Sequence, residues 1–234
     1  MITISDLSFA YPGGDFRLEI PSMVLEPGEK VAVVGPSGTG KTTLLNLIAG
    51  ITVPLAGSVQ FEEHDVSKMS DPERRAMRVS KIGFVFQDFA LLDYLSAREN
   101  ILFPYRIAAG VKIDAQARER ADHLGASCGL AGKLHRHPKA LSQGEQQRVA
   151  LCRALIMQPK LVLADEATGN LDPANKAAIL DLLFERTADQ GATLLAVTHD
   201  HELLPRFDRV IDFATFRQAQ GAVDCGSWQD QTQA

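Results

Sequence analysis

Eight consecutive residues constrain this chain more than any other part of the sequence: Gly35-Pro36-Ser37-Gly38-Thr39-Gly40-Lys41-Thr42. They fit the pattern GxxxxGK[ST], with a buried-strand pattern before them (Lys30–Val34) and apolar residues at helical spacing after them. Glycines let backbone N–H groups turn around phosphate oxygens, and a following helix directs its positive end at the same anion. We therefore predict a phosphate-binding loop in which Lys41 neutralises the β- and γ-phosphates and Thr42 offers a hydroxyl to Mg²⁺. The alternative is a glycine-rich turn without a ligand.

Composition excludes several classes of protein. Of the 234 residues, 45% are hydrophobic and 23% are charged, which is the balance of a soluble globular chain. No apolar run exceeds four residues, whereas a membrane span needs about 20, and Met1–Ile4 does not begin a signal peptide. The net charge of −5 gives no basic footprint, so we expect no nucleic-acid partner. Cys128, Cys152 and Cys225 are widely spaced and form no CxxC, which is typical of a reducing cytoplasm rather than of a disulfide framework or zinc site.

Strand and helix patterns alternate along most of the chain, which predicts an α/β fold with a mainly parallel sheet. The stretch from about 88 to 158 is mostly helical and is interpreted as an inserted helical subdomain. The expected strands are Ile2–Phe9, Asp15–Ile20 (ended by Pro21), Lys30–Val34, Ser58–Phe61, Ile82–Phe86, Leu161–Ala164, Thr193–Thr198 and Arg209–Phe213. The expected helices begin at Lys41 and Asp71 and span Arg98–Ala109, Asp114–Gly125, Gly144–Met157 and Pro173–Asp189.

Two carboxylates follow the apolar strand Leu161–Ala164 directly: Asp165 and Glu166. In a chain that also carries a phosphate-binding loop, Asp165 is placed to hold Mg²⁺, and Glu166 to act as a general base toward a water. The alternative is a solvated turn at the end of the strand.

A third motif, Leu141-Ser142-Gln143-Gly144-Glu145-Gln146-Gln147-Arg148, precedes a predicted helix. Ser142 and Glu145 have the spacing of a capping box, so the simplest interpretation is a well-capped helix. A capped N-terminus is also an anion site, and Gly144 allows close backbone approach. The stretch resembles the LSGGQ signature of ATP-binding cassette (ABC) ATPases.

Four more elements occur in the order of that family: Tyr11 (an aromatic that stacks on adenine), Gln87 (the Q-loop), Gly169-Asn170-Leu171-Asp172 (the D-loop) and Thr198-His199-Asp200 (the switch histidine). Each has a local alternative. Tyr11 and Gln87 could be ordinary strand-end residues, and Asp172 could be the N-cap of the helix from Pro173. His199 and His201 could suggest a metal pair, but no carboxylate or cysteine cluster completes it.

The resemblance covers about residues 1–213 and implies a P-loop NTPase with the ABC ATPase fold. We expect one domain with a mainly parallel core sheet, an N-terminal antiparallel β region and the helical insertion, followed by a tail over residues 214–234. The resemblance assigns catalysis to Glu166, His199 and Gln87, and Mg²⁺ to Thr42, Gln87 and Asp165. It assigns ATP to Tyr11, Gly35, Pro36, Ser37, Gly38, Thr39, Gly40, Lys41, Thr42, Thr43, Ser142, Gly144 and Glu145.

The sequence departs from the family pattern at three positions. Gln143 stands in place of the first signature glycine, and it would be strained if that position needs a positive φ. Glu145 stands where the family name has Gln. Ala167 replaces the Pro that usually follows the Asp-Glu pair, which loosens the turn but removes no chemical group.

The family places the signature of one subunit against the ATP held by another, so the resemblance implies a head-to-tail dimer of two copies around two Mg-ATP. It also implies a separate integral membrane permease that docks near residues 87–105. We thus expect a cytoplasmic chain attached peripherally to the inner or plasma membrane. The apolar stretch Phe89–Ser96 would belong to the docking surface, unless it packs inside the helical region. The form of Ala164–Asp172 and of the signature is similar to the lipoprotein-releasing, macrolide-exporter and cell-division FtsE group, which favours export or mechanotransmission.

Other functions remain as alternatives. The chain could be the ATPase subunit of an importer. A soluble ABC ATPase acting on DNA or ribosomes would carry a long coiled-coil insertion, a second cassette or a basic arm, and the sequence has none of these. A P-loop GTPase would carry a guanine-reading Asn-Lys-x-Asp, which is absent, and a P-loop kinase would not account for the signature.

Overall fold

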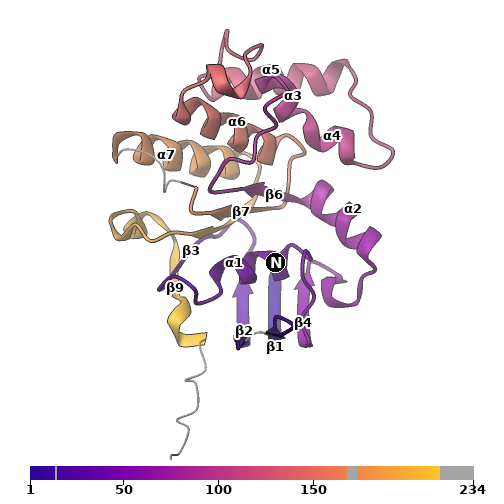
Figure 1. Cartoon of the computed structure of the whole chain (residues 1–234), viewed down its shortest axis with the longest axis vertical. Coiled ribbons are helices and arrows are strands. Elements are labelled where there is room, and N and C mark those ends of the chain that lie inside the picture. Colours follow the sequence, from indigo (N-terminus) through magenta and orange to yellow (C-terminus); the bar gives the residue numbers. More distant parts are fainter. Residues whose placement is uncertain (14, 168–172, 217–234) are drawn as a thin grey trace, which may run out of the picture.

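A parallel sheet runs through the middle of the molecule in the computed structural model, which describes residues 1–13, 15–167 and 173–216 (Figure 1). Its strand order is β6-β7-β8-β3-β9, and every neighbouring pair is parallel. The strands are β3 (Lys30–Val34), β6 (Ile82–Val85), β7 (Leu161–Asp165), β8 (Thr193–Val197) and β9 (Arg209–Asp212). This arrangement confirms the predicted mainly parallel core sheet.

The two faces of this sheet serve two hydrophobic cores, because successive side chains of a strand point to opposite sides. Val31 and Val33 of β3 belong to one core, together with Leu161 and Leu163 of β7 and Leu195 and Val197 of β8. Ala32 belongs to the other core with the even-numbered residues of those strands. These central strands are therefore apolar without interruption, which is the pattern of a strand buried on both faces.

The first core lies between the parallel sheet and an antiparallel sheet of order β2-β1-β4-β5. Its strands are β1 (Ile2–Ala10), β2 (Arg17–Leu25), β4 (Ala56–Phe61) and β5 (His64–Asp65). Helix α1 (Lys41–Ile48) lies between the two sheets (Figure 1) and buries most of its side chains there. The antiparallel region was predicted, but β5 was not.

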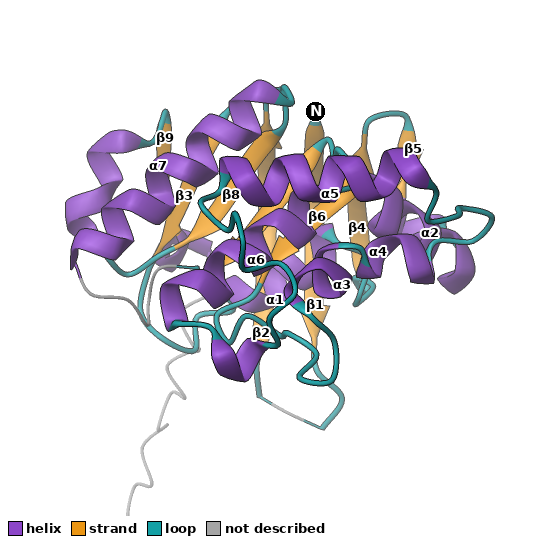
Figure 2. Cartoon of the chain, turned by 90° about the horizontal axis from the view of Figure 1, so that it is seen from above, coloured by secondary structure: helices purple, strands orange, loops and turns teal. Residues whose placement is uncertain are grey.

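The remaining helices pack mainly over the second face of the parallel sheet and at its β6 end (Figure 2). They are α2 (Asp71–Lys81), α3 (Ala97–Ile101), α4 (Phe103–Ile107), α5 (Ala115–Ser127), α6 (Gln143–Leu155) and α7 (Pro173–Asp189). Short 3₁₀ helices are η1 (Val66–Lys68), η2 (Pro138–Ala140), η3 (His201–Arg206) and η4 (Phe213–Phe216). In the described ranges, no helix is both long and apolar enough to span a bilayer.

Several expected boundaries differ from the observed ones by one or two residues, and two larger differences involve a proline. Strand β2 does not end at Pro21 but continues to Leu25. It is an edge strand with Pro21 exposed, and an edge tolerates a missing N–H. The expected helix Arg98–Ala109 is divided at Leu102 into α3 and α4, because Pro104 in the first turn of α4 cannot donate a helical hydrogen bond.

The end of the described chain remains packed against the body. Phe213 is fully buried, and its ring lies 5.6 Å from that of Phe216. The expected tail from residue 214 therefore begins with the three residues that complete η4. The rest of that stretch lies outside the described residues.

Candidate functional site

The loop between β3 and α1 has the backbone that the glycine pattern predicts. Gly35, Gly38 and Gly40 have φ values of 147°, 76° and 102°, a region that other residues avoid. Gly40 is also the N-cap residue of α1, with no side chain to cap the helix. The N–H groups of the first turn of α1 therefore remain for an anion.

Lys41 lies across this loop rather than in solvent. Its Nζ donates to the carbonyl oxygens of Gly35 at 2.7 Å and Pro36 at 2.8 Å. The hydroxyl of Thr39 donates to Pro36 O at 2.9 Å. Side chains from the second half of the loop thus hydrogen-bond to the backbone at its start. The ammonium group is held by two backbone carbonyls of the loop, and Lys41 lines the cavity over the loop, where it can face a phosphate.

The carboxylate pair Asp165 and Glu166, at the end of β7, lies next to the start of α1. Thr42 Oγ1 donates to Asp165 Oδ2 at 2.9 Å, which joins residues 123 positions apart. Burial raises the pKa of Asp165, and the neighbouring carboxylate of Glu166 raises it further, while the hydrogen bond from Thr42 and the charge of Lys41 lower it. A cation at this position would therefore relieve a charge that the fold disfavours.

The donor set at this position fits Mg²⁺. A hydroxyl and one carboxylate are hard oxygen ligands, and Mg²⁺ typically takes only one or two protein groups and completes its shell with water and substrate phosphates. In the part of the chain that the structure describes, no cluster of three or more His, Cys, Asp or Glu side chains forms an all-protein metal site. Thr42 and Asp165 are thus suited to a cation that arrives with a nucleotide.

Glu166 has an unusual backbone and a histidine partner. Its φ is 46°, in the left-handed region, although it is not a glycine. Its N–H donates to Val197 O at 3.0 Å, and its Oε2 lies 3.5 Å from His199 Nδ1. Backbone strain of this kind concentrates at functional sites. The geometry brings together the two residues that the sequence predicted as base and switch.

A cavity of about 450 Å³ opens over the loop. Tyr11 lines it; the residue is 42% exposed, and its hydroxyl lies 3.1 Å from Thr43 Oγ1. Phe16 is a lining residue that the sequence analysis missed, and its ring centroid lies 5.7 Å from that of Tyr11. The complete lining is Tyr11, Phe16, Ser37, Gly38, Gly40, Lys41, Thr42, Thr43, Glu166 and Val197. An aromatic wall opposite a phosphate loop is the shape of a nucleotide site.

Comparison with known proteins decides the family. The profile described as ABC transporter matches residues 18–169, which is more than half of the chain. The chain belongs to the ABC transporter family. It is an ATP-hydrolysing subunit of this family, and the expected fold class is confirmed.

The relatives of this ABC ATPase include two kinds of transporter protein. It is 40% identical over 227 residues to the lipoprotein-releasing system ATP-binding protein LolD 1 of Rhodopirellula baltica, covering 94% of this chain and 98% of that protein. It is 39% identical over 214 residues to the macrolide export ATP-binding/permease protein MacB of Syntrophobacter fumaroxidans. That match covers 90% of this chain but only 30% of MacB, so this chain spans less than a third of that relative.

Solved structures give the same fold. The ATP-binding cassette MJ0796, in a dimeric post-hydrolysis state bound to ADP and Pi, superposes with a TM-score of 0.81 at 32% identity, covering 91% of this chain and 94% of that one. A second dimeric structure of MJ0796, described as a bacterial ABC transporter cassette, also gives a TM-score of 0.81, at 33% identity. Both of these solved cassettes are dimers.

The signature residues do not join the cavity over the phosphate loop. Ser142 is the N-cap of α6 and accepts from Glu145 N at 3.3 Å, while the carboxylate of Glu145 accepts from Ser142 N at 2.9 Å. Neither residue, nor Gly144, is among those that line the cavity. Gln143 is the first residue of α6 and does not have a positive φ, so the condition under which glutamine would be strained here is not met.

Two further predicted elements can only be partly placed. Gln87 is exposed, two residues beyond the end of β6, and is not among the cavity-lining residues. The D-loop residues Gly169–Asp172 lie outside the described residues, and so does the proposed N-cap role of Asp172. Asp200, next to His199, accepts from Lys176 Nζ at 3.0 Å, which ties the histidine loop to α7. This ion pair has no signal in the sequence.

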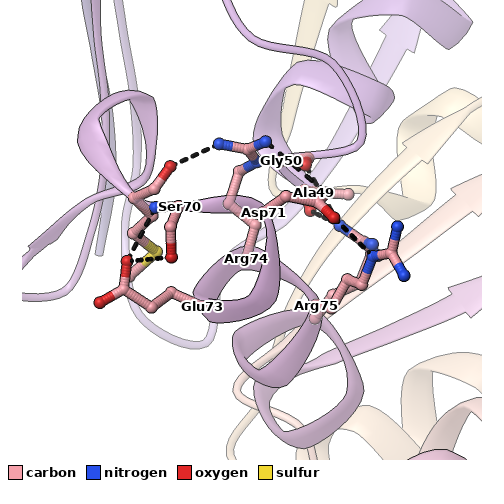
Figure 3. A network of polar contacts seen from close by, with 9 residues as sticks. Ala49, Gly50, Ser70, Asp71, Glu73, Arg74 and Arg75 are labelled. Carbon is pink, nitrogen blue, oxygen red and sulfur yellow. Dashed lines mark hydrogen bonds and ion pairs between the residues drawn. The ribbon is translucent and has the colours of Figure 1, made fainter.

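The opposite end of α1 is held by arginines of α2 (Figure 3). Arg74 Nε donates to Gly50 O at 3.1 Å, and Arg78 donates to Ala49 O at 3.0 Å and to Gly50 O at 3.2 Å. Ser70 and Glu73 cap the start of α2, with Ser70 N donating to Glu73 Oε2 at 2.7 Å. Guanidinium groups at a helix C-terminus satisfy its last carbonyls and favour its dipole. The sequence pattern located α2 but not this contact.

Proposed function

We propose that this ABC ATPase works as a head-to-tail dimer of two copies, with an ATP held between the phosphate loop of one copy and Ser142 and Gly144 of the other. One observation carries the proposal. The cavity contains the loop, Thr42 and Glu166, whereas the signature residues belong to another part of the surface. Each copy therefore presents two complementary half-sites.

Within such a site the residues of this chain have separate tasks. Lys41 and the N–H groups of α1 would hold the β- and γ-phosphates, and Thr42 and Asp165 would hold Mg²⁺, which supplies positive charge that neutralises the phosphates. Glu166 accepts a proton from the attacking water, and His199, 3.5 Å from its carboxylate, orients that water or the γ-phosphate. Tyr11 supports the adenine ring. Gln87, which extends beyond β6, is proposed to join the Mg²⁺ and the water only in the dimer.

The dimer is tested with Glu166→Gln, which keeps the shape of the side chain but removes the base. We expect ATP to convert this variant from monomer to dimer in size-exclusion chromatography with light scattering, while turnover falls about 10²–10⁴-fold. Glu119→Gln, at an exposed position of α5, is the matched control and should turn over normally. A Glu166→Gln protein that stays monomeric with saturating ATP, or that hydrolyses ATP normally, would contradict the proposal.

We also propose that a membrane permease docks into a groove between α2, β6, α4 and α6. The groove has a volume of about 300 Å³ and is mostly apolar, with Ile51, Phe86 and Ile107 among its exposed lining residues. Two arginines also line it, Arg78 and Arg153. Burial lowers the pKa of Arg153 to about 10, and its guanidinium donates to Phe89 O at 2.6 Å and to Ala90 O. The loop that follows Gln87 is thereby fixed beside the groove.

Tyr94 lies four residues beyond the groove residue Ala90 and does not itself line the groove, so it tests whether docking extends over the adjoining stretch Phe89–Ser96. It is 73% exposed, whereas Phe89 and Leu95 of the same stretch are buried, so about half of this apolar segment serves the core. Tyr94→Lys should abolish co-purification of the permease while ATP binding and thermal stability stay unchanged. Leu92 is half-buried, and loss of folding in Leu92→Lys would separate a core role from a docking role.

The transport mode is proposed from the relatives. The LolD and MacB names of the relatives support export or mechanotransmission, with the chain attached to the cytoplasmic face of the membrane. Affinity purification from solubilised membranes tests this. A partner with four spans and a large extracytoplasmic domain supports the proposal, whereas an importer permease with many spans would overturn it.

A further inference from the structure

The carboxylate of Glu145 is fully engaged within its own subunit. It stands in the first turn of α6, and its Oε2 accepts from Ser142 N at 2.9 Å. Its Oε1 accepts from Lys133 Nζ at 2.6 Å. The Glu145 side chain is 18% exposed and that of Lys133 is 37% exposed. Both oxygens thus have donors, and the pair is partly shielded from water.

Lys133 reaches α6 from a different segment, the turn after α5. The backbone of this turn is fixed, because Lys133 N donates to Leu130 O at 2.9 Å and Lys133 O accepts from Arg136 N at 2.9 Å. The lysine therefore does not need to be recruited from a mobile chain. Its ammonium group is presented to the N-terminus of α6 by a rigid turn.

A carboxylate at this position has two opposed effects. A negative charge in the first turn stabilises a helix through its dipole. The same charge repels an anion that approaches this N-terminus, and the attraction of the helix for phosphate is reduced. A glutamate is ionised at neutral pH, and the pKa of Glu145 is lowered further, chiefly by the hydrogen bond from Lys133 and then by the bond from Ser142 N. An unpaired Glu145 would therefore weaken the anion site that Ser142 caps.

We propose that Lys133 is a positioning residue for ATP turnover, because it cancels the charge of Glu145 and holds that side chain against Ser142. Ser142 Oγ and the first N–H groups of α6 then remain directed at the γ-phosphate held by the second copy. Glu145 acts through Ser142 and not by contact with the nucleotide. This inference rests on the proposed head-to-tail dimer.

The test measures ATP-driven dimerisation in the Glu166→Gln protein, which holds ATP without turnover. Lys133→Met should weaken each of the two nucleotide sites of the dimer about fivefold. The ATP concentration at which half of the protein is dimeric should therefore rise. Lys133→Arg keeps the charge and should retain most of the parent behaviour. Adding Glu145→Gln to Lys133→Met should restore dimerisation, because a neutral amide still accepts from Ser142 N but no longer repels phosphate.

The double variant separates electrostatics from structure. If the ion pair only braces the fold, Lys133→Met with Glu145→Gln should be as defective as Lys133→Met alone, and this result would overturn the proposal. Lys139→Met is the matched control, because Lys139 is 82% exposed, lies six residues along the same connection and pairs with Asp93 rather than with α6. ATP binding by the monomer should be equal in all variants, since the phosphate loop is untouched.

Two other outcomes are decisive. Parent-like dimerisation of Lys133→Met would refute the role of Lys133 while leaving the dimer intact. A parent that stays monomeric would refute the dimer itself, and this assignment with it. If Lys133→Met does not fold, as judged by its thermal melt, Lys133→Arg and the double variant carry the comparison.

Discussion

Replacing Asn100 should detach the segment proposed for permease docking from the helical region. Asn100 is fully buried in α3, and its side chain makes four hydrogen bonds to the loop that precedes the helix. Its Oδ1 accepts from Leu92 N at 2.8 Å, and its Nδ2 donates to Leu92 O at 3.1 Å, to Leu95 O at 3.1 Å and to Ser96 O at 3.0 Å. One amide therefore fixes both ends of the loop that exposes Tyr94.

The magnitude follows from these four bonds. At about 1 kcal/mol each, Asn100→Ala removes about 4 kcal/mol of hydrogen bonding. Leu92 O and Ser96 O keep a backbone donor, from Leu95 N at 3.0 Å and Asn100 N at 2.9 Å. The penalty therefore falls mainly on Leu92 N–H and Leu95 C=O, and we expect a loss of about 3 kcal/mol in the free energy of unfolding. For a chain of this size, this lowers Tm by about 6–12 °C.

Chemical denaturation and amide hydrogen exchange measure the two parts of this effect. The exchange of Leu92 N–H should accelerate in Asn100→Ala, while amides of β3 change only with global stability. Asn100→Asp should be worse than Asn100→Ala at pH 7, because a carboxylate would face three carbonyl oxygens, and its defect should shrink in acid. A loss below about 1 kcal/mol, or an aspartate better tolerated than alanine at pH 7, would refute the reasoning.

Two more predictions concern packing and charge. A Cβ on Gly83 of β6 would lie 2.3 Å from the backbone oxygen of Ala154 in α6, so Gly83→Ala should cost about 1–3 kcal/mol in urea unfolding. Gly125→Ala should cost less, since its Cβ meets only the flexible Leu134 side chain and the helix gains an alanine; equal losses would contradict this account. Asp165→Asn should raise Tm at pH 7.5 and lower turnover roughly 10²–10³-fold. Burial raises the pKa of Asp165, so its ionised form costs stability above that pKa; the gain in Tm should therefore vanish as pH falls, and a gain that grows in acid would refute this sign.

The fold and the phosphate loop could be predicted because local signals and the global fold agree there. Lys30–Val34 was located correctly from its apolar run, and the helix start at Lys41 follows from the change of period. The prediction that the second strand ends at Pro21 was wrong because proline is excluded from central strands but tolerated in edge strands. The sequence does not reveal which strand lies at an edge. Leu102 interrupts a helix for a reason that was present in the sequence, the proline two residues later.

The candidate site was predictable as a set of residues but not as a geometry. Thr42 and Asp165 could be assigned to one cation from their motifs, and the structure places them in contact. Phe16 could not be assigned to the cavity, because it is brought there by the pairing of β1 with β2. The Lys133–Glu145 pair joins a turn to a helix across 12 positions, and no periodicity predicts such a contact. Side-chain pairs of this kind depend on tertiary packing, which a single sequence does not state.

The arginines at the C-terminal end of α1 connect this helix to the proposed docking groove. With eight residues it is a rod only about 12 Å long. Its N-terminus lines the cavity in which we propose that phosphate binds. At its other end Arg74 and Arg78 donate to the carbonyls that follow the helix, and Arg78 also lines the proposed docking groove. A permease segment bound in that groove would contact Arg78. Force could then be transmitted along α1 between the permease and the nucleotide without crossing the sheet.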